Sequence, residues 1–302
     1  AWRNGAAMRA NRNRYKQYTY GQQWNDPVVD DSGAVVTEGE FAIKSGKRPM
    51  TNNLIRQLVK CVVGRFRNSL LDATSPSPQL KAISQLNNLD ELDSRLLEEF
   101  LISGCAIQRV SHEIRRAGTA VWIDNVNPSH FFVNAFTDPR GWDIELVGMT
   151  HSMSIAEVIM RFSGGDHAKA NALRQIYSQD DLHQGSAFFK TTNDRCRVIE
   201  VWTLECEESL LCHDEHYGEI FMTDLAHRAL LDQENTLRKK NKVTEIDSRW
   251  HINTYWQCRY LAPDGTLLDS FISPFNTHPF VVKLYPLIDG EVHPFVEQHQ
   301  AS

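Results

Sequence analysis

The spacing of apolar residues changes from helical to alternating near residue 105, and this change constrains the fold more than any other feature. In residues 54–66 and again in residues 89–101, apolar side chains recur every three or four positions, as on one face of a helix. In residues 106–113 and 119–126, apolar and polar residues alternate instead, as in half-buried strands. The sequence therefore predicts an α+β protein, with a helical N-terminal third packed on a mainly antiparallel β-sheet region.

Turn and capping signals support this division. Ser154 and Glu157 form a capping box that opens a helix, and Pro263-Asp264-Gly265 predicts a β-hairpin between two apolar segments. We therefore expect residues 1–105 to form the helical part and residues 106–302 to form a mixed α/β core.

Composition is that of an ordinary globular protein. The chain has 302 residues, 41% hydrophobic and 23% charged, and a net charge of −6, which argues against a general nucleic-acid coat. No apolar segment is long enough for a membrane span, and the N-terminus lacks the apolar core of a signal peptide. We expect a soluble protein made in the cytoplasm, with no membrane partner. Its six cysteines lack framework spacing, so we expect free thiols.

The first 25 residues are basic and contain no carboxylate. Aromatic side chains interleave with the positive charges, a pattern that can bind nucleic acid. The alternative is a basic arm or helix that is solvated on one side and packed on a neighbour by its aromatic residues. The candidate DNA-facing residues are Arg9, Arg12, Arg14 and Lys16.

Two successive helices carry opposite charge. The helix expected at residues 52–70 is basic, and the helix expected at residues 88–102 is acidic. They could pair within one chain or between neighbouring subunits, the basic one could contact DNA, or both could present solvated faces. The candidate subunit-interface residues are Arg56, Lys60 and Arg67 on the first helix, and Asp90, Glu91, Asp93, Glu98 and Glu99 on the second.

One segment suggests metal chemistry. Residues 206–216 hold cysteine, histidine and carboxylate side chains, which are zinc ligands. However, Cys206 and Cys212 are too widely spaced for a zinc knuckle, and adjacent Cys212 and His213 point to opposite faces of a strand. We expect a polar hairpin without metal, with a metal-dependent hydrolase or nuclease as the alternative. Gly164-Gly165 lacks the Lys and Ser or Thr of a phosphate loop, and no Gly-x-Ser-x-Gly motif occurs. We therefore expect neither catalysis nor a cofactor.

Several motifs, taken in order, resemble the wing region of portal proteins from tailed double-stranded DNA bacteriophages. An N-terminal segment with Tyr, Gly and Gln-Trp is followed by a basic helix, a Val-x-Pro segment with an aromatic pair, an Asp-Pro turn and a Met-Ser capped helix. An aromatic strand, an Asp-Gly turn and a His-Pro-Phe segment close the series. These motifs are Tyr15 to Trp24, Val126 to Pro128 with Phe131-Phe132, Asp138-Pro139, Met153 to Phe162, Tyr255 to Ser270 and His278 to Gln300.

The resemblance implies a structural role in a virion. A portal subunit forms a closed ring, typically a dodecamer, at one capsid vertex, and double-stranded DNA passes through it during packaging and ejection. Its partners would be the terminase large subunit, the head-to-tail connector, and capsid or scaffolding protein. Because the chain starts at Ala1 and stops in what reads as the first turn of a helix, we expect a fragment that ends before the stem and clip. Another capsid or tail structural protein is a further alternative.

Overall fold

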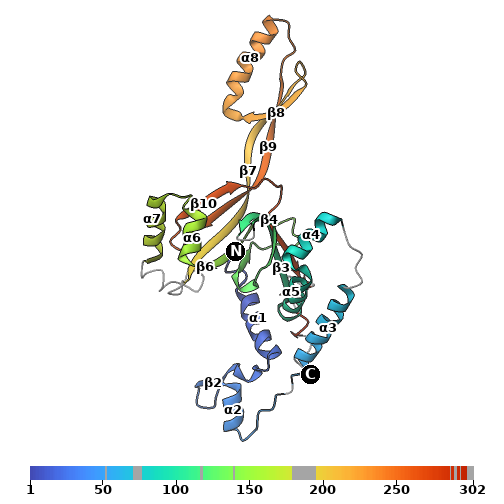
Figure 1. Ribbon diagram of the computed structural model, residues 1–302, viewed down its shortest axis with the longest axis vertical. Helices are drawn as coiled ribbons and strands as arrows, with labels where there is room; N and C mark the ends of the chain where they lie inside the picture. Colours follow the sequence, from blue (N-terminus) through green and yellow to red (C-terminus); the bar gives the residue numbers. More distant parts are fainter. Residues whose placement is uncertain are drawn as a thin grey trace.

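The protein is an elongated α+β molecule in which every strand pair within the described residues is antiparallel. The computed structural model describes residues 1–51, 53–70, 77–115, 118–138, 140–178, 195–285, 287–288, 291–292 and 294–297. A central body of two sheets lies between a helical end and a long projecting arm (Figure 1). The predicted fold class is confirmed; the division at residue 105 remains a prediction.

The helical end has a small core of its own. It is built by three helices, α1 (Ala6–Thr19), α3 (Leu54–Leu70) and α5 (Leu89–Ser103). The buried side chains of this core come from all three helices and from the C-terminal segment 294–297. Within that segment Val296 is fully buried, and its N–H donates to the carbonyl of Leu101 at 3.2 Å. Segment 294–297 therefore packs back onto the N-terminal helices.

The two predicted charged helices both form, and their ends follow local signals. The acidic helix α5 stops at Gly104, which adopts the left-handed conformation that favours glycine (φ 73°). Asn88 (φ 50°) separates α5 from a preceding helix, α4 (Pro78–Asn87), whose N-cap is Ser77. Nearer the N-terminus, a hairpin of β1 (Pro27–Val29) and β2 (Val35–Thr37) leads into α2 (Glu38–Lys44).

The body consists of two sheets and two helices around one core. The smaller sheet has the order β11-β3-β4, and the larger one has the order β10-β9-β7-β6-β5, with β8 on the free part of β7. Apolar side chains of both sheets and of α6 and α7 form one cluster between them. The elements are β3 (Cys105–Arg115), β4 (Gly118–Asn125), β5 (Phe131–Val133), β6 (Leu146–Met153), α6 (Ile155–Phe162), α7 (His167–Ser178), β7 (Cys196–Asp214), β9 (Asp247–Leu261), β10 (Leu267–Ile272) and β11 (Phe280–Leu284). Short elements complete the described chain: η1 (Gln23–Asn25), η2 (Pro128–His130), η4 (Leu225–His227), β12 (Leu287–Ile288) and β13 (Glu291–Val292).

Strands β7 and β9 continue far beyond the body and form the arm, residues 204–256 (Figure 1). At its tip, β8 (Glu219–Asp224) pairs with the end of β7, and helix α8 (Arg228–Lys240) packs on one face through a small apolar cluster. Between tip and body only two strands run side by side, residues 204–208 opposite residues 252–256; we call this ribbon the neck. From Leu204 to the end of β7 the arm extends roughly 33 Å, at about 3.3 Å per residue.

Within the described parts of the chain, no helix combines the length and apolarity that crossing a membrane requires.

Candidate interaction surfaces and a buried ionic network

The basic and acidic helices pair within one chain. The Arg67 guanidinium lies 2.9 Å from a carboxylate oxygen of Glu91, and Glu91 also accepts from Arg95 at 2.8 Å. The hydrogen bond from Arg95 and the charge of Arg67 lower the pKa of Glu91. Helices α3 and α5 also share the apolar core of the helical end. Intrachain pairing, one of the expected alternatives, is therefore present for Arg67 and Glu91.

The other residues of α3 from the candidate set lie at its surface. Arg56 packs its guanidinium over the ring of Tyr20, 5.3 Å from the ring centre. Lys60 is exposed one turn further along the helix. A charge that contacts another molecule must be accessible, so Lys60 is the clearest interface candidate on α3.

The remaining candidates on α5 differ in exposure. Asp90 is exposed, whereas Asp93 is half-buried and accepts from Gln108 of β3 at 3.1 Å. Glu98 is half-buried beside Tyr20, and burial together with the Glu98 charge raises the pKa of the Tyr20 phenol. Most of this acidic face is thus engaged within the chain.

Arg12 and Glu99, which were placed in two separate candidate sets, bind each other. Two guanidinium nitrogens of Arg12, Nε and Nη2, lie 2.6 and 2.7 Å from the two carboxylate oxygens of Glu99. The third nitrogen, Nη1, donates to the Ser129 hydroxyl at 3.1 Å. Arg12 is only 7% exposed. This bidentate pair ties α1 to α5 and to the body, so neither side chain faces outward in the chain.

The other basic residues of α1 have different surroundings. Arg9 stacks on the ring of Trp2 at 3.7 Å and donates to the Trp2 carbonyl. Arg14 is exposed and pairs with Asp26 at 2.7 Å, whereas Lys16 is simply exposed. Arg9, Arg12 and Arg14 each have a partner within the chain, and contact of any of the four basic residues with DNA stays a prediction.

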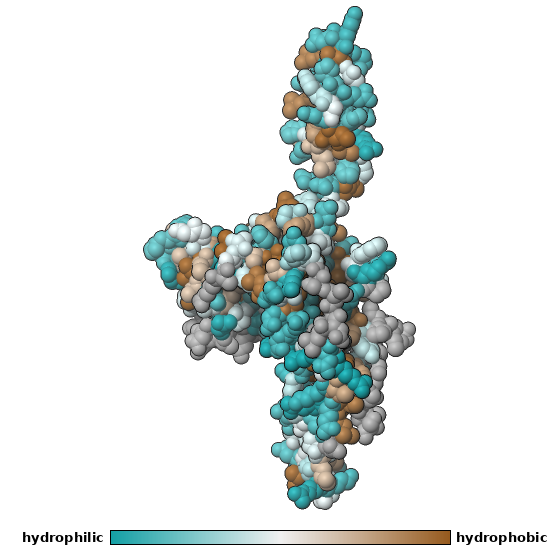
Figure 2. Space-filling model, turned by 45° about the vertical axis from the view of Figure 1, so that its right-hand side comes forward, coloured by the Kyte–Doolittle hydropathy of each residue, from teal (hydrophilic) through white to brown (hydrophobic). Residues whose placement is uncertain are grey.

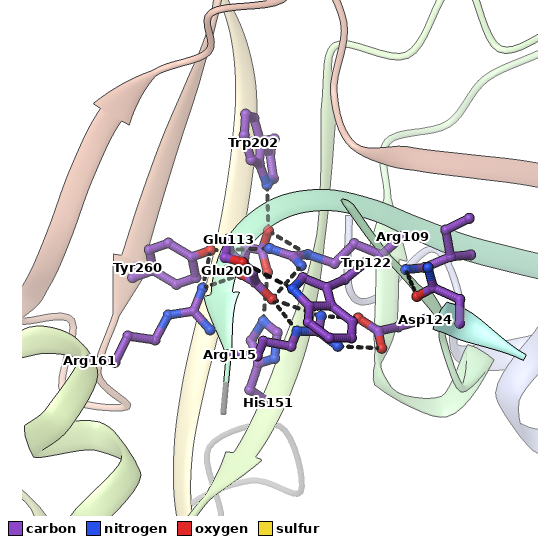
Figure 3. A network of polar contacts seen from close by, with 12 residues as sticks. Arg109, Glu113, Arg115, Trp122, Asp124, His151, Arg161, Glu200, Trp202 and Tyr260 are labelled. Atoms are coloured by element: carbon purple, nitrogen blue, oxygen red, sulfur yellow. Dashed lines mark hydrogen bonds and ion pairs between the residues drawn. The ribbon is translucent and has the colours of Figure 1, made fainter. Parts of the chain in front are cut away.

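A polar cluster that was not predicted joins the two sheets of the body. At its centre is Glu200 of β7, which is fully buried (Figure 3). Its carboxylate accepts from Arg109 of β3 at 3.1 Å and from the indole of Trp202 at 2.7 Å, and lies 2.6 Å from the ring of His151 of β6. A buried carboxylate requires such partners, because an unpaired buried charge is strongly unfavourable.

The electrostatics of this network keep Glu200 ionised. Burial alone would raise the pKa of Glu200, but Arg109 and His151 outweigh it and lower the pKa to about 2. Burial alone would lower the pKa of Arg109, but Glu200, Tyr260 and Glu113 together outweigh it and raise the pKa. Burial, aided by Glu200, raises the pKa of Tyr260. At neutral pH Glu200 and Arg109 are both charged and Tyr260 keeps its proton, so an ion pair ties the two sheets together.

A second shell of ion pairs extends the network to the surface. Arg161 of α6 donates to the Tyr260 hydroxyl at 2.8 Å and lies 3.4 Å from Glu113. Arg115 binds Glu113 at 2.7 Å and also binds Asp124 (Figure 3). Each carboxylate of this shell therefore faces at least one arginine, and together they connect β3, β4 and α6.

The cysteine and histidine side chains of residues 206–216 are not brought together by the fold. Cys206 lies in the neck, while Cys212 lies buried under α8, roughly 20 Å away at about 3.3 Å per strand residue. His213 is on the opposite face of β7 from Cys212, and Asp214 binds Arg238 of α8 at 2.7 Å. Throughout the described residues, no group of three or more potential ligands could hold a metal ion. All six cysteines are free thiols, as expected.

One cleft of about 430 Å³ lies between α1 and the body. Its walls combine apolar side chains, such as Met8, Phe132 and Val282, with polar ones, such as Asn11 and Asn134. This lining offers a place for a side chain or a small apolar group.

A scan of family models and a search of curated proteins give no match for this chain.

Proposed function

We propose that this chain is a structural subunit of a phage portal ring, which forms the DNA passage at a capsid vertex. The proposal is supported by the sequence motifs from residue 15 to residue 300, which resemble those of portal proteins in their order. On this proposal the partners are other copies of the chain, the terminase large subunit, head-to-tail connector and capsid or scaffolding proteins, and the DNA that passes through, and the chain functions in the virion.

The structural observation that supports an assembly role is the arm. It projects from the body, and apolar side chains lie along its surface (Figure 2). Five that stand well away from the body are Ile220, Met222, Leu230, Leu237 and Trp250, each between 53% and 70% exposed. Exposed apolar surface of this extent on an extended element is typical of a subunit whose partners cover it.

The polar chemistry of the chain fits the same proposal. Its buried acids, Glu200 and Asp214, are both bound by arginine, and residues 206–216 lack the arrangement that the hydrolase alternative requires. In this proposal the Glu200–Arg109 pair stiffens the body, and the Asp214–Arg238 pair holds α8 to the tip of the arm.

Electron microscopy of the full-length protein tests the proposal. Closed rings with a central channel would support it. Monomers or compact dimers at the same concentration would refute it, and a stable assembly without a channel would favour another capsid or tail protein.

Charge reversal tests whether α3 contributes to ring contacts. We expect reversal of Arg56, Lys60 and Arg67 together to weaken assembly, but Arg67 also pairs with Glu91 in the chain. Lys60→Glu alone is therefore the sharper variant, because Lys60 is exposed. Lys169→Glu, at an exposed position on α7, is the matched control. Equal ring yield for the two variants would exclude this face of α3 from the interface.

A further inference from the structure

The sheet at the tip of the arm has two unpaired edges within the described residues. Its order is β8-β7-β9, because β8 and β9 pair with the same residues of β7 from opposite sides. Strand β10 pairs with β9 only at residues 257–261, well below the tip. The outer edge of β8 and the outer edge of β9 at residues 247–252 thus both present free backbone groups.

The β8 edge has charged residues only at its two ends and lacks other features that protect an edge strand. Residues 219–224 contain no proline and no lysine, and their pairing with β7 shows no bulge. Three consecutive apolar side chains are exposed: Ile220 at 70%, Phe221 at 36% and Met222 at 53%. Such an edge is a template for an added strand.

The β9 edge is equally open but differs in chemistry. In residues 247–252, every side chain is exposed or half-buried, including Trp250 at 57% and Ile252 at 44%. This edge carries Arg249 and His251 with Asp247 at its start, whereas β8 has acidic residues, Glu219 and Asp224, at its two ends. The chain therefore presents one acidic, apolar edge and one aromatic edge of mixed charge.

We infer that β8 of one copy pairs with residues 247–252 of β9 in the next copy, so that the tip sheets join into one continuous sheet. This inference rests on the proposed ring, whose interface it names. Pairing of β8 with a second β8 is disfavoured, because a centred antiparallel pair sets Glu219 against Asp224 at both ends. With the arms at equal height, pairing with β9 brings Asp224 beside His251, and only the other end of β8, at Glu219, approaches a carboxylate, that of Asp247.

The geometry of the pairing follows from the fold. Both β8 and β9 are antiparallel to β7, so they run in the same direction. If neighbouring arms point the same way, β8 therefore meets the next β9 in parallel. Each copy uses each edge once, which is the heterologous contact that a closed ring requires. Within one chain, Leu211 of β7 pairs with Met222 on one side and with Arg249 on the other, so Met222 and Arg249 lie at the same height along the arm. If neighbouring arms stand at equal height, Met222 therefore lies beside Arg249 of the next copy.

Disulfide cross-linking of the full-length protein tests this pairing. The background carries Cys61→Ser and Cys206→Ser, since these are the two exposed cysteines. Met222→Cys and Arg249→Cys are then introduced together. Within one chain the two positions are two strands apart, roughly 9.6 Å, which is too far for a disulfide. We expect a ladder of dimers, trimers and larger species on non-reducing gels after mild oxidation.

Single-cysteine variants identify which edges meet. We expect a mixture of the Met222→Cys and Arg249→Cys proteins to give dimers only, and each protein alone to give none. Self-linking of Met222→Cys would show that β8 meets β8 and would overturn the inference. Absence of any product from the double variant would overturn it as well.

Edge blocking gives a second measurement. Ile220→Lys places a charge on the free edge, at a side chain already 70% exposed, so the fold tolerates it. The matched control is Ile114→Lys, at an 82% exposed position on β3. We expect Ile220→Lys to reduce ladder formation by the double-cysteine protein at least about fivefold, relative to the control. Equal yields would count against the pairing.

Electron microscopy of the same samples separates this inference from the proposed function. Rings without cross-links would overturn the arm contact and leave the portal proposal standing. Monomers without cross-links would overturn both.

Discussion

Glu200→Gln should destabilise the chain by about 3 kcal/mol, because it leaves the buried Arg109 guanidinium beside a neutral amide. The pKa of Glu200 falls from the ordinary 4.5 to about 2 on folding. At about 1.4 kcal/mol per pKa unit, this difference corresponds to about 3 kcal/mol of stability at neutral pH. In other proteins, removing one partner of a buried ion pair costs about 3–5 kcal/mol of stability, which agrees with this value.

The same residue predicts an acid dependence with a defined sign. Because the folded pKa lies below the unfolded one, the contribution of Glu200 is fully present above pH 4.5 and is lost as the pH falls toward 2. The stability difference between the wild type and Glu200→Gln should therefore narrow in acid.

Urea denaturation at pH 7 and at pH 4, followed by circular dichroism, measures both effects. Glu205→Gln is the control. Glu205 lies on β7, as Glu200 does, and binds Arg259 at 2.5 Å, but it is nearer the surface. We expect Glu205→Gln to lower the free energy of unfolding by less than about 1 kcal/mol at pH 7. The reasoning is refuted if Glu200→Gln lowers the free energy of unfolding no more than Glu205→Gln does. It is also refuted if the stability difference between the wild type and Glu200→Gln is as large at pH 4 as at pH 7.

Three further predictions concern separate parts of the chain. Gly148→Ala should destabilise the chain by about 3 kcal/mol or more in urea titrations, because the added Cβ would lie 2.2 Å from a carbonyl oxygen of β7. Gly64→Ala, with open space around it in α3, should instead stabilise the chain by about 0.5–1 kcal/mol. Asp214→Asn should speed hydrogen exchange in α8 and leave exchange in the body unchanged, because its main partner is Arg238 of that helix; equal acceleration in the body would contradict this. Cys206→Ser should change stability by less than about 0.5 kcal/mol and leave the zinc content of the purified protein unaltered, whereas loss of stoichiometric zinc would revive the hydrolase alternative.

The sequence predicted those elements whose ends are set by local chemistry. The capping box of Ser154 and Glu157 opens α6 as expected, and Gly104 ends α5. The hairpin at residues 263–265 joins β9 and β10. In each case the deciding interaction lies within a few residues of the chain, where spacing alone reveals it.

The arm was missed because its strands are recognised only through each other. Residues 202–207 of β7 do alternate between apolar and polar, which is compatible with a strand, but this pattern does not show which segment pairs with it. In the neck, the partners of residues 204–208 are residues 252–256, which lie more than forty positions away. Only the three-dimensional pairing shows that β7 continues for 19 residues.

The ionic network was missed for a similar reason. Arg109, His151 and Glu200 come from three strands and two sheets. One local signal did exist: Glu200 stands within the segment VIEVW, which is otherwise apolar on both faces. A carboxylate in a central strand predicts a buried cation somewhere, although the sequence cannot say which arginine provides it.

The length of the neck fixes the direction in which the tip of the arm faces. Side chains of a strand alternate faces with a period of two. Inserting one residue into each strand of the neck would therefore turn α8 and both tip edges toward the opposite side of the molecule. Inserting two residues into each strand would restore their direction and lift the tip by about 6.6 Å. Two-stranded ribbons also twist more than wider sheets. Related chains that keep the same neighbours should therefore vary the length of this ribbon in even steps, while the body beneath it stays unchanged.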